Sequence, residues 1–226
     1  MKSFATFLAG TALALGANAA TVSFNFGSPT LGLQTTEINQ SGVLGLFNSS
    51  LGTLTGVSFN VSGAESTSLS LTNGARGPQT TTATSTVELT FGSTLGALNV
   101  LLLNASPFIL SASPGRVTIP VNTTLSFGPL TNSFTNTPVN VSSIQGNFAN
   151  VGGGTFNVGC TSVSGLSLLG GGGNISSTQA TQAACGAQVT YTFTPTANQV
   201  PEPGSLALFG AALAGVALLR RKSQKA

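Results

Sequence analysis

Few side chains in this 226-residue chain could carry out acid–base or nucleophilic chemistry. The sequence has no Asp, His or Trp, and between its two ends the carboxylates are Glu37, Glu65 and Glu88. The only thiols are Cys160 and Cys185. These absences exclude a Ser-His-Asp triad, a His-ligated zinc or iron site and an Asp-based calcium loop. We therefore predict no metal site and no cofactor.

Two of the glutamates could in principle form the carboxylate pair that hydrolyses a glycoside. Glu88 lies on the polar side of a predicted strand, whereas Glu37 and Glu65 fall in loop-like segments. Nothing in their spacing brings two of them together, so we interpret them as solvated charges or as partners of Arg76 and Arg116. We expect that the protein is not an enzyme, and Glu-dependent glycoside hydrolysis is a remote alternative.

The N-terminus has the pattern of a secretion signal. Lys2 precedes the thirteen-residue apolar run 4–16, and an A-x-A site at 17–19 follows it. This order of a positive residue, an apolar run and small residues is typical of a signal peptide. We predict that residues 1–19 are removed by cleavage between Ala19 and Ala20, and that residues 20–199 lie outside the cytoplasm.

The two cysteines are then in an oxidising compartment, where an even pair favours a disulfide. A Cys160–Cys185 bond would close a loop of about 25 residues and, in the chain-entropy model, stabilise the fold by about 3 to 4 kcal/mol. The loop encloses the flexible run Gly170–Gly173. A catalytic thiol would lack a His to form or orient its thiolate.

The body, residues 20–199, predicts an all-β fold. Short runs alternate apolar and small polar residues, which places the apolar set on one face of each strand. Such strands, separated by Gly, Pro and Asn, favour a single β-sandwich or jelly-roll-like domain. The predicted strands are 22–26, 57–61, 69–71, 87–91, 117–119, 125–127, 139–141, 156–158 and 189–193.

Three other expectations concern the inside of this body. We predict a doubly buried strand at 97–103, with a helix as the competing interpretation, and low-complexity loops at 80–86 and 170–173. Phenylalanines are the expected anchors of one core, namely Phe24, Phe59, Phe91, Phe127, Phe148, Phe156 and Phe193. The exposed face of the body is expected to carry Ser, Thr and Asn in place of charged residues.

Charge is concentrated at the chain ends. The formal net charge is +3 and the pI is about 9.3. Between residues 20 and 199, however, three glutamates and two arginines leave a net charge of −1. The body offers no basic patch for a phosphate backbone, so we expect no nucleic-acid partner.

The last 27 residues, 200–226, combine three features. The segment Val200, Pro201, Glu202, Pro203 and Gly204 disfavours helix. Residues 205–219 are uncharged and apolar, and a helix of this length spans about 22 Å, short of a ~30 Å hydrocarbon core. The basic end 220–226 starts with Arg220, Arg221 and Lys222, which can snorkel and stay in the cytoplasm. We predict a short transmembrane helix, and a plain membrane anchor is the alternative to a sorting signal.

In this order and position the tail resembles the PEP-CTERM sorting signal of exported bacterial proteins. The resemblance rests on Pro201, Glu202, Pro203 and the basic end, and it covers about 27 residues. It implies an exosortase-type membrane protease as a partner, with removal of the helix near Pro203 and transfer to another attachment. It implies nothing about the fold or activity of residues 20–199.

Together these features predict an exported, non-enzymatic surface or extracellular-matrix protein. It would be tethered transiently to the inner membrane, with its body outside the cytoplasm, and then reach the cell surface or medium. The main alternative is a carbohydrate-binding module or adhesin with an exopolysaccharide partner, because the resemblance associates such sorting systems with exopolysaccharide producers. Against that alternative, sugar-binding platforms favour exposed aromatic rings, and the body has only Tyr191 besides its phenylalanines.

Overall fold

We analysed the protein in a computed structural model that describes residues 19–27 and 32–196. The predicted sorting motif, tail helix and basic end lie outside the described residues, as does the predicted signal peptide apart from Ala19. The described residues form one compact unit, which ends near residue 194.

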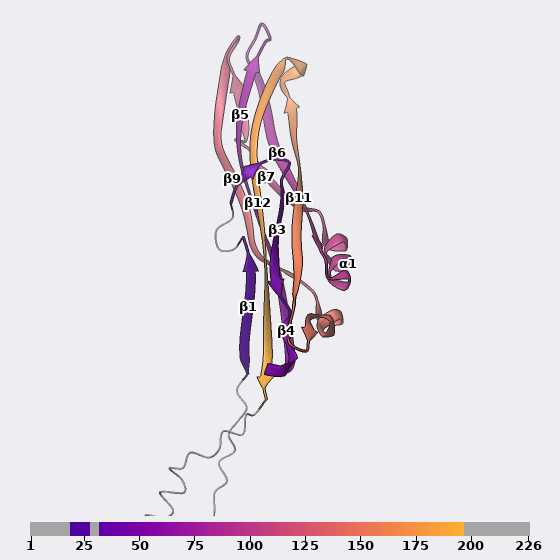
Figure 1. Cartoon of the computed structure of the whole chain (residues 1–226). Coiled ribbons are helices and arrows are strands. Elements are labelled where there is room, and N and C mark those ends of the chain that lie inside the picture. Colours follow the sequence, from indigo (N-terminus) through magenta and orange to yellow (C-terminus); the bar gives the residue numbers. More distant parts are fainter. Residues whose placement is uncertain (1–18, 28–31, 197–226) are drawn as a thin grey trace, which may run out of the picture. The chain divides into compact units, whose positions relative to one another are not determined.

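Two antiparallel sheets make up this unit (Figure 1). Sheet A has the order β1-β12-β5-β9 with β2 beside β12: β1 (Ala20–Phe26), β12 (Ile175–Pro195), β5 (Gly52–Asn73), β9 (Thr124–Val139) and β2 (Gln34–Thr35). Sheet B has the order β3-β11-β6-β7 with β8 beside β6: β3 (Asn39–Gly45), β11 (Thr155–Gly170), β6 (Gln79–Ser93), β7 (Phe108–Ala112) and β8 (Arg116–Ile119). The parallel pair β4 (Phe47–Asn48) and β10 (Ala149–Asn150) stands apart. This confirms an all-β architecture of sandwich type.

The strands are longer than the sequence predicted. β5 alone has 22 residues, which corresponds to about 70 Å, and it unites the predicted strands 57–61 and 69–71. Register shifts between Val61 and Gly63 and between Thr67 and Leu69 interrupt its pairing with β9. The predicted loop at 80–86 is wrong, because these residues belong to β6, where threonine fits a pleated strand well. The predicted strand 139–141 extends two residues beyond the end of β9.

The predicted strand at 97–103 is also wrong. These residues lie in helix α1 (Gly96–Ala105), the competing interpretation. Ala and Leu are strong helix formers, and Leu98 and Leu102, four residues apart, are buried while Val100 and Leu103 are exposed. The helix ends where the Ser106 hydroxyl donates to the Leu102 carbonyl, 2.8 Å away. The described part of the chain also has three short 3₁₀ helices: η1 (Ser49–Leu51), η2 (Ser142–Phe148) and η3 (Gly171–Gly173).

Among the described residues, all buried aromatic side chains lie in the larger of two apolar clusters inside the sandwich. Of the predicted anchors, Phe24 and Phe127 are only half-buried, and the buried ones are Phe59, Phe91, Phe148, Phe156 and Phe193. Two rings outside this predicted set, Phe47 and Tyr191, are also fully buried.

The Cys160–Cys185 disulfide is present, as predicted. It joins β11 of sheet B to β12 of sheet A, and both cysteines are buried in the larger cluster. The predicted loop at 170–173 is the turn between these two strands, where Gly171, Gly172 and Gly173 have positive φ. Because the two cysteines are ten and twelve residues away from the segment 170–173, the bond fastens the two sheets together within the core.

Candidate functional site

The structure separates the three glutamates of the body. Glu37 follows β2, is exposed, and accepts a hydrogen bond from the Ser164 backbone N–H at 3.0 Å. Glu88 is exposed on β6, opposite Val163 of β11. Glu65 belongs to β5 and is only 1 % exposed. Glu37 and Glu88 fit the predicted solvated charges, whereas the prediction that Glu65 lies in a loop as a solvated charge is wrong.

Glu65 is the most perturbed carboxyl of the described residues. Neither of its carboxylate oxygens has a hydrogen-bond partner. Burial penalises the charged form and raises the pKa of Glu65 from its ordinary value of 4.5 to about 7. A strand with period two places residue 65 on the same face as Val61 and Leu69, so an interior position follows from the register of β5.

Other polar side chains share the interior with Glu65. The Thr67 and Thr181 hydroxyls are 2.7 Å apart, and the Gln179 amide donates to Thr181 at 2.6 Å and to Ser85 at 3.0 Å. We call Glu65, Thr67, Ser85, Gln179 and Thr181 the polar layer. Its hydroxyls and amide are mutually satisfied, as buried polar groups require, and the Glu65 carboxyl is the exception.

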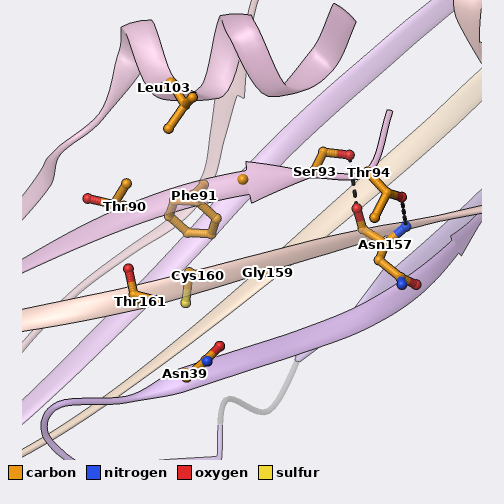
Figure 2. A pocket seen from close by; sticks show the side chains of 11 residues that line it. Asn39, Thr90, Phe91, Ser93, Thr94, Leu103, Asn157, Gly159, Cys160 and Thr161 are labelled. Atoms are coloured by element: carbon orange, nitrogen blue, oxygen red, sulfur yellow. Dashed lines mark hydrogen bonds between the residues drawn. The ribbon is translucent and has the colours of Figure 1, made fainter. Parts of the chain in front are cut away.

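A groove on the outer face of sheet B is the second candidate site (Figure 2). Its floor is formed by Gly159 of β11, which pairs with Gly92 of β6 on one side and Ser41 of β3 on the other. A Cβ atom on Gly92 would lie 3.2 Å from Oδ1 of Asn99 in α1. Glycine there lets the helix approach the sheet and leaves the floor without side chains.

Uncharged polar side chains line this groove of about 330 Å³ together with apolar parts of Leu103, Phe91 and Cys160. In Figure 2, Leu103 points from α1 toward the strands, and Asn39 lies on the opposite side. Asn157 is held in place because its N–H donates to the Thr94 hydroxyl at 2.8 Å and its carbonyl accepts from the Ser93 hydroxyl at 2.9 Å. The groove offers hydroxyl and amide groups without charge.

The Tyr191 side chain does not reach the protein surface. It is fully buried, and its hydroxyl donates to the Gly45 carbonyl at 2.8 Å. Phe24, Phe47 and Phe148 surround its ring, with centroid distances of 5.8 to 6.2 Å. Tyr191 is therefore a core residue and is excluded as a sugar-stacking platform.

The remaining predicted site residues are at or beyond the ends of the described chain. Ala19 precedes β1 and Ala20 is its first residue, which places the predicted signal cleavage immediately before the sandwich. The five motif residues 200–204 and the basic end from Arg220 lie outside the described residues. Within residues 19–27 and 32–196, no group of three or more potential metal ligands is found. In the same part of the chain, no helix is long and apolar enough to cross a membrane.

The chain has remote likenesses to solved structures. The infectious bursal disease virus T13 particle is 10 % identical over 89 % of this chain and 47 % of its own, with a TM-score of 0.22. Tobacco streak virus coat protein is 14 % identical over 85 % and 96 %, with a TM-score of 0.17. A family two carbohydrate esterase from Cellvibrio japonicus is 9 % identical over 79 % and 35 %, with a TM-score of 0.16. The chain spans about half the length of the first of these, and TM-scores this low support no functional conclusion.

The sequence of the tail, unlike the fold of the body, indicates what kind of protein this is. No curated protein matches the chain. The family model described as the PEP-CTERM protein-sorting motif matches residues 199–222, which include Pro201, Glu202, Pro203 and the start of the basic end. This motif is a sorting signal recognised by exosortase, a membrane protease, and it implies export toward the cell surface. The chain is therefore a PEP-CTERM-containing protein.

Proposed function

We propose that the protein is a non-enzymatic surface or extracellular-matrix protein whose tail is processed by an exosortase-type protease. Residues 1–19 are removed during export, the helix at 205–219 holds the chain in the inner membrane, and cleavage near Pro203 then frees the body for the cell surface or medium. The observation that carries this proposal is the match of the sorting motif at residues 199–222.

The scarcity of charge on the surface of the body supports a role in which copies of the protein pack closely together. Its exposed charges in the described residues are Glu37, Glu88, Arg76 and Arg116. Elsewhere on the surface, hydroxyl groups of neighbouring strands pair with each other, as those of Thr72 and Thr124 do at 2.7 Å. Because mixed surface charge normally keeps proteins apart, a surface with four charges gives little electrostatic resistance to dense packing.

The disulfide supports residence outside the cytoplasm. Disulfides persist in oxidising compartments and are rare where thiols are kept reduced. Cys160 and Cys185 are 3 % and 2 % exposed, and they connect the two sheets inside the larger apolar cluster. Such a bond fits a structural role in an exported protein.

Intact mass of the protein from cells and from the medium tests this proposal. We expect a chain that begins at Ala20, ends near Pro203 and lacks two hydrogens because of the disulfide. Additional mass at the new C-terminus would indicate covalent attachment to another surface component. A single species running from Ala20 to Ala226 and found only with the cells would contradict the proposal and indicate a permanent membrane anchor.

Substitution of the motif makes the same test specific. Glu202→Ala changes the centre of the motif, so we expect the uncut chain to accumulate in the membrane fraction. Glu88→Ala is the matched control, because Glu88 is an exposed glutamate of the body. Equal processing of both variants would contradict recognition through the motif.

A carbohydrate-binding module or adhesin is the second candidate function. The observation that favours it is the charge-free groove, where Asn39, Asn157, Thr90 and Thr161 could hydrogen-bond the hydroxyls of a neutral exopolysaccharide. We expect retention of the protein on such a polysaccharide to fall with Asn157→Ala. Asn25→Ala, at an exposed position of β1, is the control, and unchanged retention of both variants would remove the groove as a binding site.

Glu-dependent glycoside hydrolysis has weaker support than either of these functions. Glu65 is in the interior, and Glu88 is exposed on β6. Glu37 is engaged with Ser164. Substituting each glutamate by Gln and finding an unchanged trace of polysaccharide hydrolysis would eliminate this alternative.

A further inference from the structure

The first strand of the sandwich lies at the edge of sheet A and has one hydrogen-bonded neighbour strand. β1 pairs with β12 only, through seven residue pairs from Ala20–Phe193 to Phe26–Ala187. It begins at the residue that becomes the N-terminus after the predicted signal cleavage. Seven residues, 27–33, connect it to β2, and fully extended they span about 24 Å.

The slot that receives β1 is shaped for two phenylalanines. Phe26 lies against Gly42 of β3, and a Cβ atom on Gly42 would overlap the Phe26 side chain. Phe24 lies against Gly45 in the same way, where an added Cβ would be 2.6 Å from Cε1 of the ring. Tyr191 of β12 meets Phe24 edge-on at a centroid distance of 6.2 Å. The slot between β12 and β3 therefore recognises β1 by shape and by backbone pairing.

Nothing in this recognition requires β1 and the slot to belong to one chain. An edge strand presents backbone groups that pair with any complementary strand, and exchange of an identical element is a low-cost route to association. β1 has no charged residue, and neither has the facing segment 187–193 of β12. A second copy would thus meet the same contacts without electrostatic repulsion.

We propose that β1 is exchanged between copies of this chain: the strand of one copy docks between β12 and β3 of a second copy and links the bodies without a covalent bond. The partner is a second copy of this chain. The inference rests on the proposed function in one respect, since signal removal frees the end of β1 and surface deposition brings copies together.

Concentration decides between the closed and the exchanged form, because both make the same contacts. A strand joined to its sheet by only seven residues has an effective concentration in the millimolar range for its own slot. In dilute solution each copy therefore keeps its own β1. In a dense surface layer, where neighbouring slots reach a comparable local concentration, exchange competes and copies become linked.

Cross-linking of the full chain, expressed in a host that exports it and carries an exosortase-type protease, tests the exchange. The hydroxyls of Ser23 in β1 and Thr190 in β12 are 2.8 Å apart on the outer face of sheet A, so the variant S23C/T190C places two thiols together. The protein is concentrated, oxidised and separated by non-reducing denaturing electrophoresis. We expect a ladder of covalent oligomers. The fraction of the protein in these oligomers should be several-fold smaller when the protein is oxidised in dilute solution. Only cross-linked monomer at every concentration would overturn the proposal.

A matched pair of cysteines controls for random collisions. Thr72 of β5 and Thr124 of β9 are equally close, at 2.7 Å, but neither strand is proposed to exchange. We expect T72C/T124C to give cross-linked monomer, and a ladder equal to that of S23C/T190C would overturn the proposal. The native disulfide is buried and interferes with neither pair. Should S23C/T190C fail to fold, T21C/T192C offers the next outward pair of β1 and β12.

Mass measurement on the same samples keeps the two proposals apart. Processed chains that give only monomer would refute strand exchange and leave the sorting proposal intact. Chains that retain the tail yet give the ladder would refute the processing and support the exchange.

Discussion

The two apolar clusters inside the sandwich differ in size and in the kind of side chain. The larger cluster holds the buried aromatic rings and the disulfide, with Phe91, Phe148 and Tyr191 at 0 % exposure. The smaller cluster consists of four buried aliphatic residues, Leu69, Leu71, Ala83 and Ile119, with partly buried neighbours. The polar layer lies between them along the strands. Both clusters thus belong to one sandwich, but only the larger one is stabilised by buried aromatic rings and a disulfide.

The inward face of each long strand shows how the division arises. β6 passes from Ala83 in the smaller cluster through Ser85 to Val87 in the larger one. β5 passes from Val61 through Glu65 and Thr67 to Leu69. Since local opening follows the density of buried apolar contacts, the end with the smaller cluster is expected to open more readily.

Truncation of a buried side chain in each cluster measures this difference. Phe91→Ala removes a fully buried ring that meets Phe108 edge-on at 5.5 Å, so we expect a loss of about 4 kcal/mol in the free energy of unfolding. Leu71→Ala should cost about 2 to 3 kcal/mol, because its partly buried neighbours can close the cavity. Urea unfolding measures both, with Val163→Ala, 63 % exposed, as a control expected within about 0.5 kcal/mol of wild type. A larger loss for Leu71→Ala would reverse the ranking of the clusters.

Removal of the disulfide weakens the larger cluster selectively. Cys160 and Cys185 are 25 residues apart, and the chain-entropy model gives a loss of about 3.5 kcal/mol for a loop of this length. We expect C160A/C185A to unfold at a lower urea concentration and to lose amide-exchange protection around Phe156 and Val189. Unchanged stability would show that apolar packing alone holds the two sheets together.

The carboxyl of Glu65 makes stability depend on pH. The pKa of Glu65 is raised from 4.5 to about 7 in the folded protein, so folding favours its protonated form. The stabilisation is complete below pH 4.5 and is lost as pH rises through 7, by about 3 kcal/mol in all. We expect the free energy of unfolding to fall between pH 5 and pH 8.

Two variants isolate this effect, because the chain has no His that would titrate in the same range. Glu65→Gln should flatten the pH profile, whereas Glu88→Gln, at an exposed position, should leave it unchanged. A wild-type profile that stays level or rises toward pH 8 would show that the Glu65 carboxyl finds compensation within the polar layer.

Local pattern predicted the fold class and most of the strands. Alternation in segments such as 87–91 and 189–193 placed Leu89 and Val189 inside, because a strand exposes alternate residues to opposite faces. At Gly96–Ala105 the preferred strand is wrong and the competing helix is right, because a continuous apolar run has no period that separates strand from helix. The low complexity of residues 80–86 predicts a loop, but the branched side chains of their threonines favour the strand that the structure shows.

The candidate sites were less predictable. The groove depends on Gly92 and Gly159, which are 67 positions apart and meet only in the register of β6 with β11. The burial of Tyr191 depends on rings from β1, β4 and η2. Alternation along β5 was the one signal that could have placed Glu65 inside, because it continues the inward face of Phe59 and Val61.

The sequence by itself determined the sorting tail, the all-β class and the disulfide pair, because each depends on composition, order or period within the chain. Only the tertiary structure decided that the disulfide joins opposite sheets, that Glu65 is buried without a partner, and that the interior is split by a polar layer. These features arise when strands far apart in the sequence face each other, and their energies come from contacts that no single segment contains.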